Sequence, residues 1–252
     1  MPSTVACLCG QVSITLAADR PVCCCECCCC DCAATMQWCR TTNNNNNSRI
    51  SKEKEVDVEP SPARLFYFDN DITDIQGEDH LMLLKLRDSS ASLRIATTCC
   101  ASVLLNLHWL YFQRRIMVLD QTCRLKYEEM TDDPVQPYAR IQTKFWNAIT
   151  DKPLPPTNIP SYACGDPLWV LNSQLFQKVV MAKVPSQSER QGETAQDLIG
   201  RLQQRQKENE KNNSNKLLVV LGREEPQLPG HFQTGCGMFS LTLRNPLATA
   251  GP

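Results

Sequence analysis

Cysteine residues carry the chemistry that this chain could perform. Eight of the ten residues from Cys23 to Cys32 are cysteine, and a separate Cys7-Leu8-Cys9-Gly10 precedes them. Thiolates at this density are typical of sites for a soft metal ion, above all zinc, which takes four ligands at the corners of a tetrahedron. A disulfide framework is the weaker alternative. The first residues lack the charged and apolar segments of a signal peptide, so a reducing, cytoplasmic location is expected.

The spacing of the cysteines predicts two metal sites of different kinds. The Cys7–Cys9 pair could meet the Cys99–Cys100 pair in a closed site of four sulfurs, which would be structural. The central run contains the spacing C-x-C-x-x-C in three registers, which are Cys27/Cys29/Cys32, Cys23/Cys25/Cys28 and Cys25/Cys27/Cys30. Three thiolates leave the fourth coordination position open, as in a catalytic or exchangeable zinc site. A thiol entering that position would ionise, because a bound cation lowers the pKa of its ligand.

The composition of the chain bears on whether it binds nucleic acid or a membrane. The chain has 252 residues, 42% of them hydrophobic and 21% charged, and a formal net charge of −1. This near-neutral balance gives no electrostatic reason to expect a nucleic-acid partner. The longest apolar run, Val103 to Phe112, is interrupted by Asn106 and His108. It falls short of the roughly 20 residues that a membrane span needs, so no membrane partner is expected.

Up to residue 125 the chain has the pattern of short β-strands. Val12, Ile14 and Leu16 alternate with polar residues, and Gly10 permits a tight hairpin turn before them. Further strands are expected at 65–68, 81–86, 93–97, 103–110 and 116–119. The cysteine run follows neither a strand nor a helix period and is expected to be a loop around an ion. An asparagine tract and a charged stretch make 41–62 a flexible insertion.

Residues 126–252 have a different pattern and are expected to form an α-rich extension. Apolar residues recur at helical spacing in 138–149 and 168–179. The polar segment 186–215 can form only an exposed helix or a disordered linker, and 217–221 is typical of a buried strand. The sequence therefore predicts a mainly-β fold, with a zinc-braced β domain at 1–125 followed by a mixed, partly helical C-terminal region.

The order of these motifs resembles the glutathione-dependent formaldehyde-activating enzyme family, which includes centromere protein V and has a zinc-holding β-tent fold. Cys7-Leu8-Cys9-Gly10 matches the opening motif of the family. Thr98 to Leu104 resembles its later C-x-x-C-G-S/T-x-L motif, with Ala101 in place of glycine and Thr97 at the position of its first cysteine. Asp31-Cys32-Ala33-Ala34 is similar to the D-C-Q-A that closes the three-cysteine motif, which favours the register Cys27/Cys29/Cys32. The resemblance covers about residues 5 to 120.

This resemblance implies a zinc-dependent carbon–sulfur lyase. A structural zinc would be held by Cys7, Cys9, Cys99 and Cys100, and a second zinc on Cys27, Cys29 and Cys32 would present its open position to an adduct of a small thiol such as glutathione. The alternative is a non-catalytic zinc-binding module whose C-terminal half binds a protein partner. A metal buffer is a third interpretation. The remaining cysteines and histidines are expected to serve packing or to lie at the surface; they are Cys39, Cys123, Cys164, Cys236, His80, His108 and His231.

Overall fold

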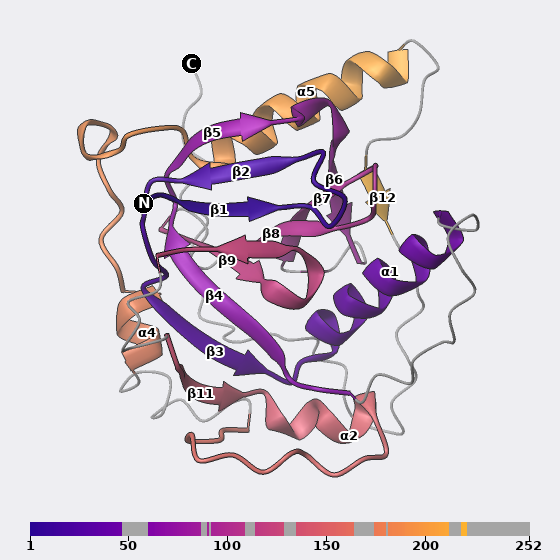
Figure 1. The fold of residues 1–252 in the computed structure, drawn as a ribbon, viewed down its shortest axis with the longest axis vertical. Helices are drawn as coiled ribbons and strands as arrows, with labels where there is room; N and C mark the ends of the chain where they lie inside the picture. Colours follow the sequence, from indigo (N-terminus) through magenta and orange to yellow (C-terminus); the bar gives the residue numbers. More distant parts are fainter. Residues whose placement is uncertain are drawn as a thin grey trace, which may run out of the picture.

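Two β-sheets make up most of the structure, a computed structural model that describes residues 1–46, 60–86, 90, 92–108, 114–128, 135–163, 174–179, 181–211 and 218–220 (Figure 1). The smaller sheet has the antiparallel order β10-β1-β2-β5, with β1 Ser3–Ala6, β2 Ser13–Leu16, β5 Ile72–Gln76 and β10 Arg124–Lys126. The larger sheet has the order β11-β3-β4-β9-β8-β7-β6-β12. Its strands are β3 Cys23–Cys27, β4 Ala63–Asp69, β6 Leu81–Lys85, β7 Ser92–Thr97, β8 Val103–His108, β9 Arg115–Leu119, β11 Pro137–Ile141 and β12 Leu218–Val220. The prediction of a mainly-β fold is confirmed.

The main hydrophobic core lies between the two sheets. Val5 and Ile14 of the smaller sheet pack in one buried cluster with Phe66, Ile95 and Leu105 of the larger sheet. Alternate residues of each strand point to opposite faces, so the second face of the larger sheet has to be covered separately. Within the residues that the structure describes, no helix combines the length and the apolar character needed to cross a bilayer.

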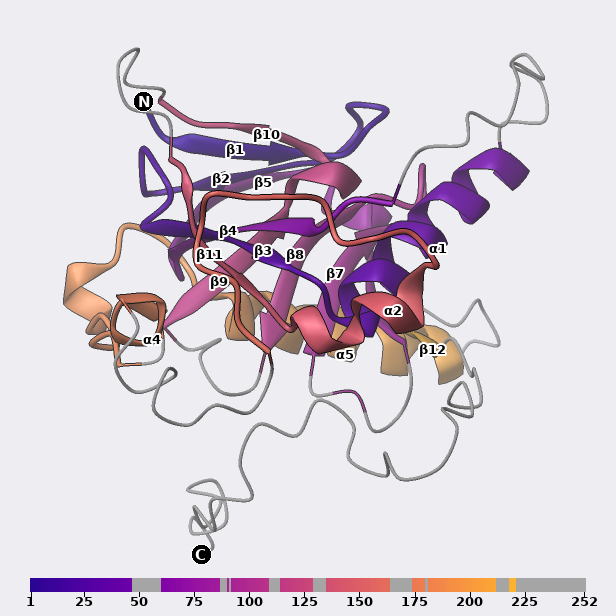
Figure 2. The ribbon, with the colours of Figure 1, turned by 90° about the horizontal axis from the view of Figure 1, so that it is seen from below.

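Helices cover the larger sheet. Among the described residues, the helices are α1 Cys30–Asn46, α2 Trp146–Ile149, α4 Gln174–Val179 and α5 Ala195–Lys211. The short 3₁₀ turns in the same part of the chain are η1 Glu78–His80, η2 Asp120–Thr122, η3 Thr143–Phe145 and η4 Gln187–Glu189. Cys39 of α1 packs with Leu84 and Ala96, whereas Leu198 of α5 packs in the main core with Ile95. Because Ala96 and Ile95 are neighbours on β7, α1 and α5 lie against opposite faces of the sheet (Figure 2).

The cysteine run does not form the expected loop. Its first part, Cys23–Cys27, is the strand β3, which pairs with β4 on one side and with β11 on the other. Four of these five residues are buried, because both faces of the strand are covered. Such a strand shows no alternation of polar and apolar residues, which is why its period was not recognisable. In the expected insertion at 41–62, residues 41–46 continue α1, and 47–59 lie outside the described residues.

The C-terminal region adds to the same sheet and the same core. The helical spacing at 138–149 was a wrong prediction for 137–141, which form β11 parallel to β3, and a right one for α2. The region 186–215 was expected to be an exposed helix or a linker, and the helix is found, but one of its faces is buried. At 195–211 it forms α5, in which Ala195, Leu198 and Leu202 are buried at helical spacing. Residues 164–173 and 212–217 lie outside the described residues.

Local hydrogen bonds explain where α5 begins. Thr194 and Asp197 form a reciprocal cap: the Thr194 backbone N–H donates to Asp197 Oδ2 at 2.8 Å, and the Asp197 N–H donates to Thr194 Oγ1 at 3.2 Å. Just before this cap, the Asp71 carboxylate accepts hydrogen bonds from the backbone N–H groups of Gln191 (2.8 Å) and Gly192 (2.7 Å). The start of the helix is thereby fixed to the loop between β4 and β5.

Candidate metal sites

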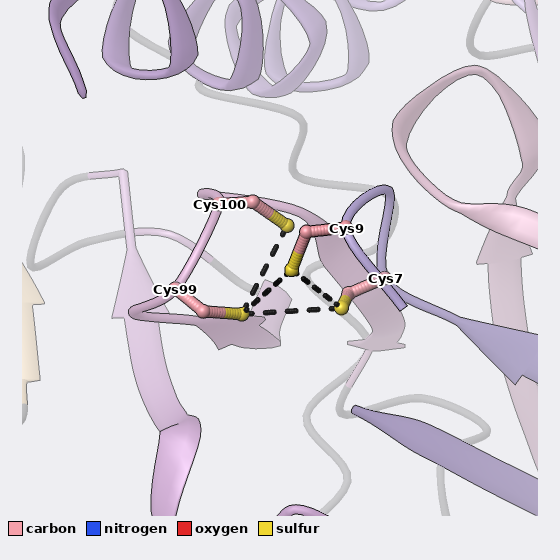
Figure 3. Close-up of side chains that lie close together, drawn as sticks. All are labelled: Cys7, Cys9, Cys99 and Cys100. Carbon is pink, nitrogen blue, oxygen red and sulfur yellow. Dashed lines mark hydrogen bonds between the residues drawn. The ribbon is translucent and has the colours of Figure 1, made fainter. Parts of the chain in front are cut away.

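Two loops far apart in the sequence bring four cysteines together, which we call the four-cysteine group (Figure 3). Cys7 and Cys9 lie in the turn between β1 and β2, and Cys99 and Cys100 lie in the turn between β7 and β8. All four Sγ atoms lie within 4.8 Å of one another. The Sγ–Sγ distance is 3.4 Å for Cys7–Cys9 and for Cys9–Cys99, and 3.9 Å for Cys7–Cys99 and for Cys99–Cys100.

These distances fit a tetrahedral zinc ion. Zinc–sulfur bonds of about 2.3 Å place neighbouring sulfurs about 3.8 Å apart at the corners of a tetrahedron. A disulfide would need an S–S distance of about 2.05 Å, and every cysteine in the described residues is free. The geometry of the four-cysteine group therefore suits a closed metal site better than a disulfide.

Backbone conformation holds the two turns in register. Gly10 has a φ of 84° and Ala101 a φ of 48°, both in the left-handed region that turns of this kind require. The Val12 backbone N–H donates to Cys7 Sγ at 3.2 Å, and the Leu8 N–H donates across to Ser102 Oγ of the other turn at 2.9 Å. The first of these hydrogen bonds fixes the Cys7 sulfur within its own turn, and the second ties the two turns to each other.

The thiols of the four-cysteine group differ in pKa. Burial opposes ionisation of Cys100, but hydrogen bonds, above all from Ser102 Oγ at 3.1 Å, lower the pKa of its thiol to about 6. Burial raises the pKa of Cys99 to about 12. Cys100 is thus the member of this pair that favours the thiolate form, and Cys99 would have to lose its proton when a metal ion binds.

A second group of sulfurs, the three-cysteine group, lies where β3 passes into α1. Cys27 ends β3, Cys29 lies in the connection, and Cys32 belongs to the first turn of α1. Their Sγ atoms lie within 4.8 Å of one another. Cys27 and Cys29 are buried and Cys32 is partly exposed, and the Cys32 N–H donates to Cys29 Sγ at 3.3 Å. The group can offer three sulfurs to an ion.

Charge in the three-cysteine group collects on Cys32. Hydrogen bonds from Cys27 and Cys29 lower the pKa of Cys32 to about 5; burial and the Asp31 carboxylate oppose this shift, and the positive charge of Arg94 adds to it. The same hydrogen bonding, first with Cys29, raises the pKa of Cys27 well above its usual value. Without a metal ion, the group thus holds one thiolate, on Cys32, that accepts hydrogen bonds from two thiols. A divalent cation would take the place of the two thiol protons.

The structure distinguishes among the registers of the cysteine run. Of the three, it brings together Cys27/Cys29/Cys32 and does not group Cys23/Cys25/Cys28 or Cys25/Cys27/Cys30, although all of these residues are described. Burial raises the pKa of Cys23 to about 12, and Cys25 Sγ lies 3.6 Å from the hydroxyl of Tyr67. These cysteines are neutral and serve as packing residues of β3.

Sequence reasoning missed Arg94, which is 2% exposed beside the three-cysteine group. It lies between Leu93 and Ile95 in the strand Ser92–Thr97, and a charged residue between these apolar neighbours was the available signal. The expected packing roles fit Cys39 and Cys123, which are buried, and His80, which is exposed. Burial lowers the pKa of His108 to about 4, so its imidazole is neutral near pH 7. Cys164, Cys236 and His231 lie outside the described residues.

Comparison with known proteins does not assign a family or a function to these cysteine groups. The chain matches no family model and no curated protein.

Proposed function

We propose that this protein binds zinc at both cysteine groups. The observation that carries the proposal is the meeting of four Sγ atoms from turns about ninety residues apart, all within 4.8 Å of one another and with four of the six spacings at 3.4 to 3.9 Å. All-sulfur sites with tetrahedral spacing favour zinc over magnesium or calcium, which prefer oxygen ligands. The zinc in the four-cysteine group would be structural, because four protein ligands leave no open position.

The three-cysteine group is proposed as the reactive site. Bound zinc would supply there the positive charge that ionises a thiol in the fourth position. The family that the sequence resembles gives the reaction: the thiolate sulfur of glutathione attacks the carbonyl carbon of formaldehyde, and the C=O electron pair takes up a proton to give the hydroxymethyl adduct. The reverse reaction breaks the same carbon–sulfur bond. The protein would act as a carbon–sulfur lyase on this adduct.

The chain's own residues support this role in two ways. Cys27 and Cys29 are 5% and 9% exposed, so they hold their side of the site away from water. Cys32 is the one partly exposed member of the group, so we propose that a thiol approaches from its side. The positive charge of Arg94 favours negative charge on sulfur at this point.

Two measurements test the proposal. Native mass spectrometry of the intact chain should show two zinc ions, and four or more would favour a metal buffer instead. Exchange spectroscopy by NMR should show that the zinc-loaded protein speeds the equilibration of glutathione with formaldehyde. Cys29→Ser should abolish this effect and remove one ion, whereas Cys30→Ser, outside both groups, should do neither. A parent protein with two ions that neither binds glutathione nor alters the rate would contradict the lyase.

A non-catalytic module is the second candidate function. The low exposure of Cys27 and Cys29 is equally compatible with it, because a site with two of three ligands buried can also be closed by a further protein group. Glutathione titration separates the two candidates: the lyase requires saturable binding to the zinc-loaded protein, and a closed module predicts none.

A further inference from the structure

Polar residues lie on the face of the larger sheet that α1 covers. Arg94 on β7 lies directly opposite Asn106 on β8, and Asn106 lies opposite Met117 on β9. Residues opposite each other in antiparallel strands share a face, so the three side chains form a row across the sheet. Met117 packs in the same cluster as Cys27 and Cys29. Strand pairing continues the row from Met117 through Tyr67 to Cys23 of β3. At the other end of the row, Arg94 reaches the start of α1, the helix that carries Cys32.

Arg94 connects this row to the helix that carries Cys32. Its Nε donates to Thr35 Oγ1 at 2.7 Å, and its Nη2 donates to the Asp31 backbone carbonyl at 3.4 Å. Both partners belong to the first turns of α1. A buried guanidinium is costly unless it is well paired, so these contacts fix the start of α1 over β7. Nη2 also lies 4.0 Å from the Asp31 carboxylate, so the positive charge near the Cys32 sulfur is that of a paired guanidinium.

Asn106 offers an unused donor in the same place. Its side chain is 5% exposed, and its Nδ2 atom has no hydrogen-bond partner in the described part of the chain. A buried donor without an acceptor destabilises the fold. An oxygen atom of a ligand seated beside the three-cysteine group would supply the missing acceptor.

We propose that Arg94 and Asn106 form the polar wall of the three-cysteine site and select its ligand. Arg94 is a positioning residue that holds Cys32 and offsets the negative charge of three cysteine thiolates and a fourth, exogenous thiolate. Asn106 donates from Nδ2 to an oxygen of that ligand. The ligand class is a small thiol that carries an oxygen acceptor close to its sulfur. This inference rests on the proposed function, because it needs a metal ion with an open position.

The test uses the full chain loaded with Co²⁺, whose visible absorption bands report the ligands of each site. The probes are 2-mercaptoethanol and ethanethiol, which differ by one hydroxyl group. The parent should bind 2-mercaptoethanol about fivefold more tightly, as one neutral hydrogen bond contributes. Asn106→Leu should remove that preference and leave ethanethiol binding unchanged. Arg94→Met should weaken both thiols about tenfold, the effect of one pKa unit, and Arg94→Lys should restore most of the loss because it keeps the charge.

Cobalt in the four-cysteine group of the same molecule is the internal control, and its bands should stay the same in every variant. If Arg94→Met misfolds, it loses the cobalt bands of both cysteine groups. In that event, the thiol binding of Asn106→Leu and Arg94→Lys decides whether the inference holds. Equal binding of the two thiols by the parent, or unchanged thiol binding in Arg94→Met, would overturn the inference alone. A parent that holds cobalt on three cysteines but responds to neither thiol would instead refute the open position and the proposed function with it.

Discussion

Replacing Cys9 by serine separates the contribution of a metal ion from that of side-chain packing. Cys9 is exposed, whereas Cys7 of the same turn is fully buried in the main core. The change Cys9→Ser therefore removes one of four sulfur ligands without opening a cavity. Any large loss of stability must then come from the metal site, because an exposed serine differs little from an exposed cysteine in packing.

The expected loss can be worked out from the ligand count. Structural zinc contributes about 10–16 kcal/mol of folding free energy in small sulfur-rich sites. One ligand of four corresponds to about 3–4 kcal/mol of this total. That is a large part of a net stability of about 5–15 kcal/mol. With a urea dependence of about 3 kcal/mol per molar, the unfolding midpoint should fall by about 1 M.

Urea unfolding followed by circular dichroism, at a fixed excess of zinc, measures this shift. Cys30→Ser makes the same chemical change in a partly exposed cysteine outside both groups, and its midpoint should stay near that of the parent. In the presence of a strong chelator, Cys9→Ser and the parent should unfold together. If Cys9→Ser has the midpoint of the parent in zinc, the four-cysteine group does not brace the fold and the reasoning is refuted.

Other single substitutions test the register of the cysteine run and the packing around it. Cys29→Ser should cost one bound zinc ion by native mass spectrometry, and Cys25→Ser should cost none; the reverse would favour the Cys23/Cys25/Cys28 register. His108 has a pKa lowered from 6.5 to about 4, mainly by burial, with Arg94 adding to the shift and Asp31 opposing it. Its stabilising effect is therefore complete above pH 6.5 and is lost as the pH falls to about 4, by at most about 3 kcal/mol. The parent should lose that much relative to His108→Gln in urea unfolding across this range, and parallel pH profiles would exclude the effect. Leu198→Ala on the buried face of α5 should cost about 2–5 kcal/mol. Gly200→Ala on the same helix, with open space at its Cβ position, should stabilise by about 0.5–1 kcal/mol; a neutral Leu198→Ala would show that α5 does not pack as described.

Local sequence patterns were enough to predict most of the β structure. The strands at 65–68, 81–86, 93–97 and 116–119 are found as β4, β6, β7 and β9 within about two residues at each end. The cysteine pairs at 7–9 and 99–100 do meet in space, as their spacing indicated. Each of these segments can be recognised from its own residues, either as a run of apolar residues flanked by turn residues or as a pair of cysteines in a turn.

The parts that could not be predicted depend on contacts with distant segments. The strand β3 shows no period of its own, because β4 and β11 flank it and both of its faces are buried. The segment that forms α5 is polar on average, and only its burial against the sheets makes Leu198 and Leu202 core residues. Arg94 acquires its position from Thr35 and Asp31, which lie about sixty residues earlier in the chain.

The two cysteine groups are nested along the chain. Residues 10–98 form one long segment whose two ends meet at the four-cysteine group, and all three residues of the three-cysteine group lie inside that segment. An ion at the outer position would pin both ends of the segment, whereas an ion at the inner position would pin neither. The three-cysteine group therefore depends on the four-cysteine group, but not the reverse. Removing the ion from the four-cysteine group should loosen the segment that holds the three-cysteine group. A chelator that first removes the ion from the three-cysteine group should leave the four-cysteine group intact.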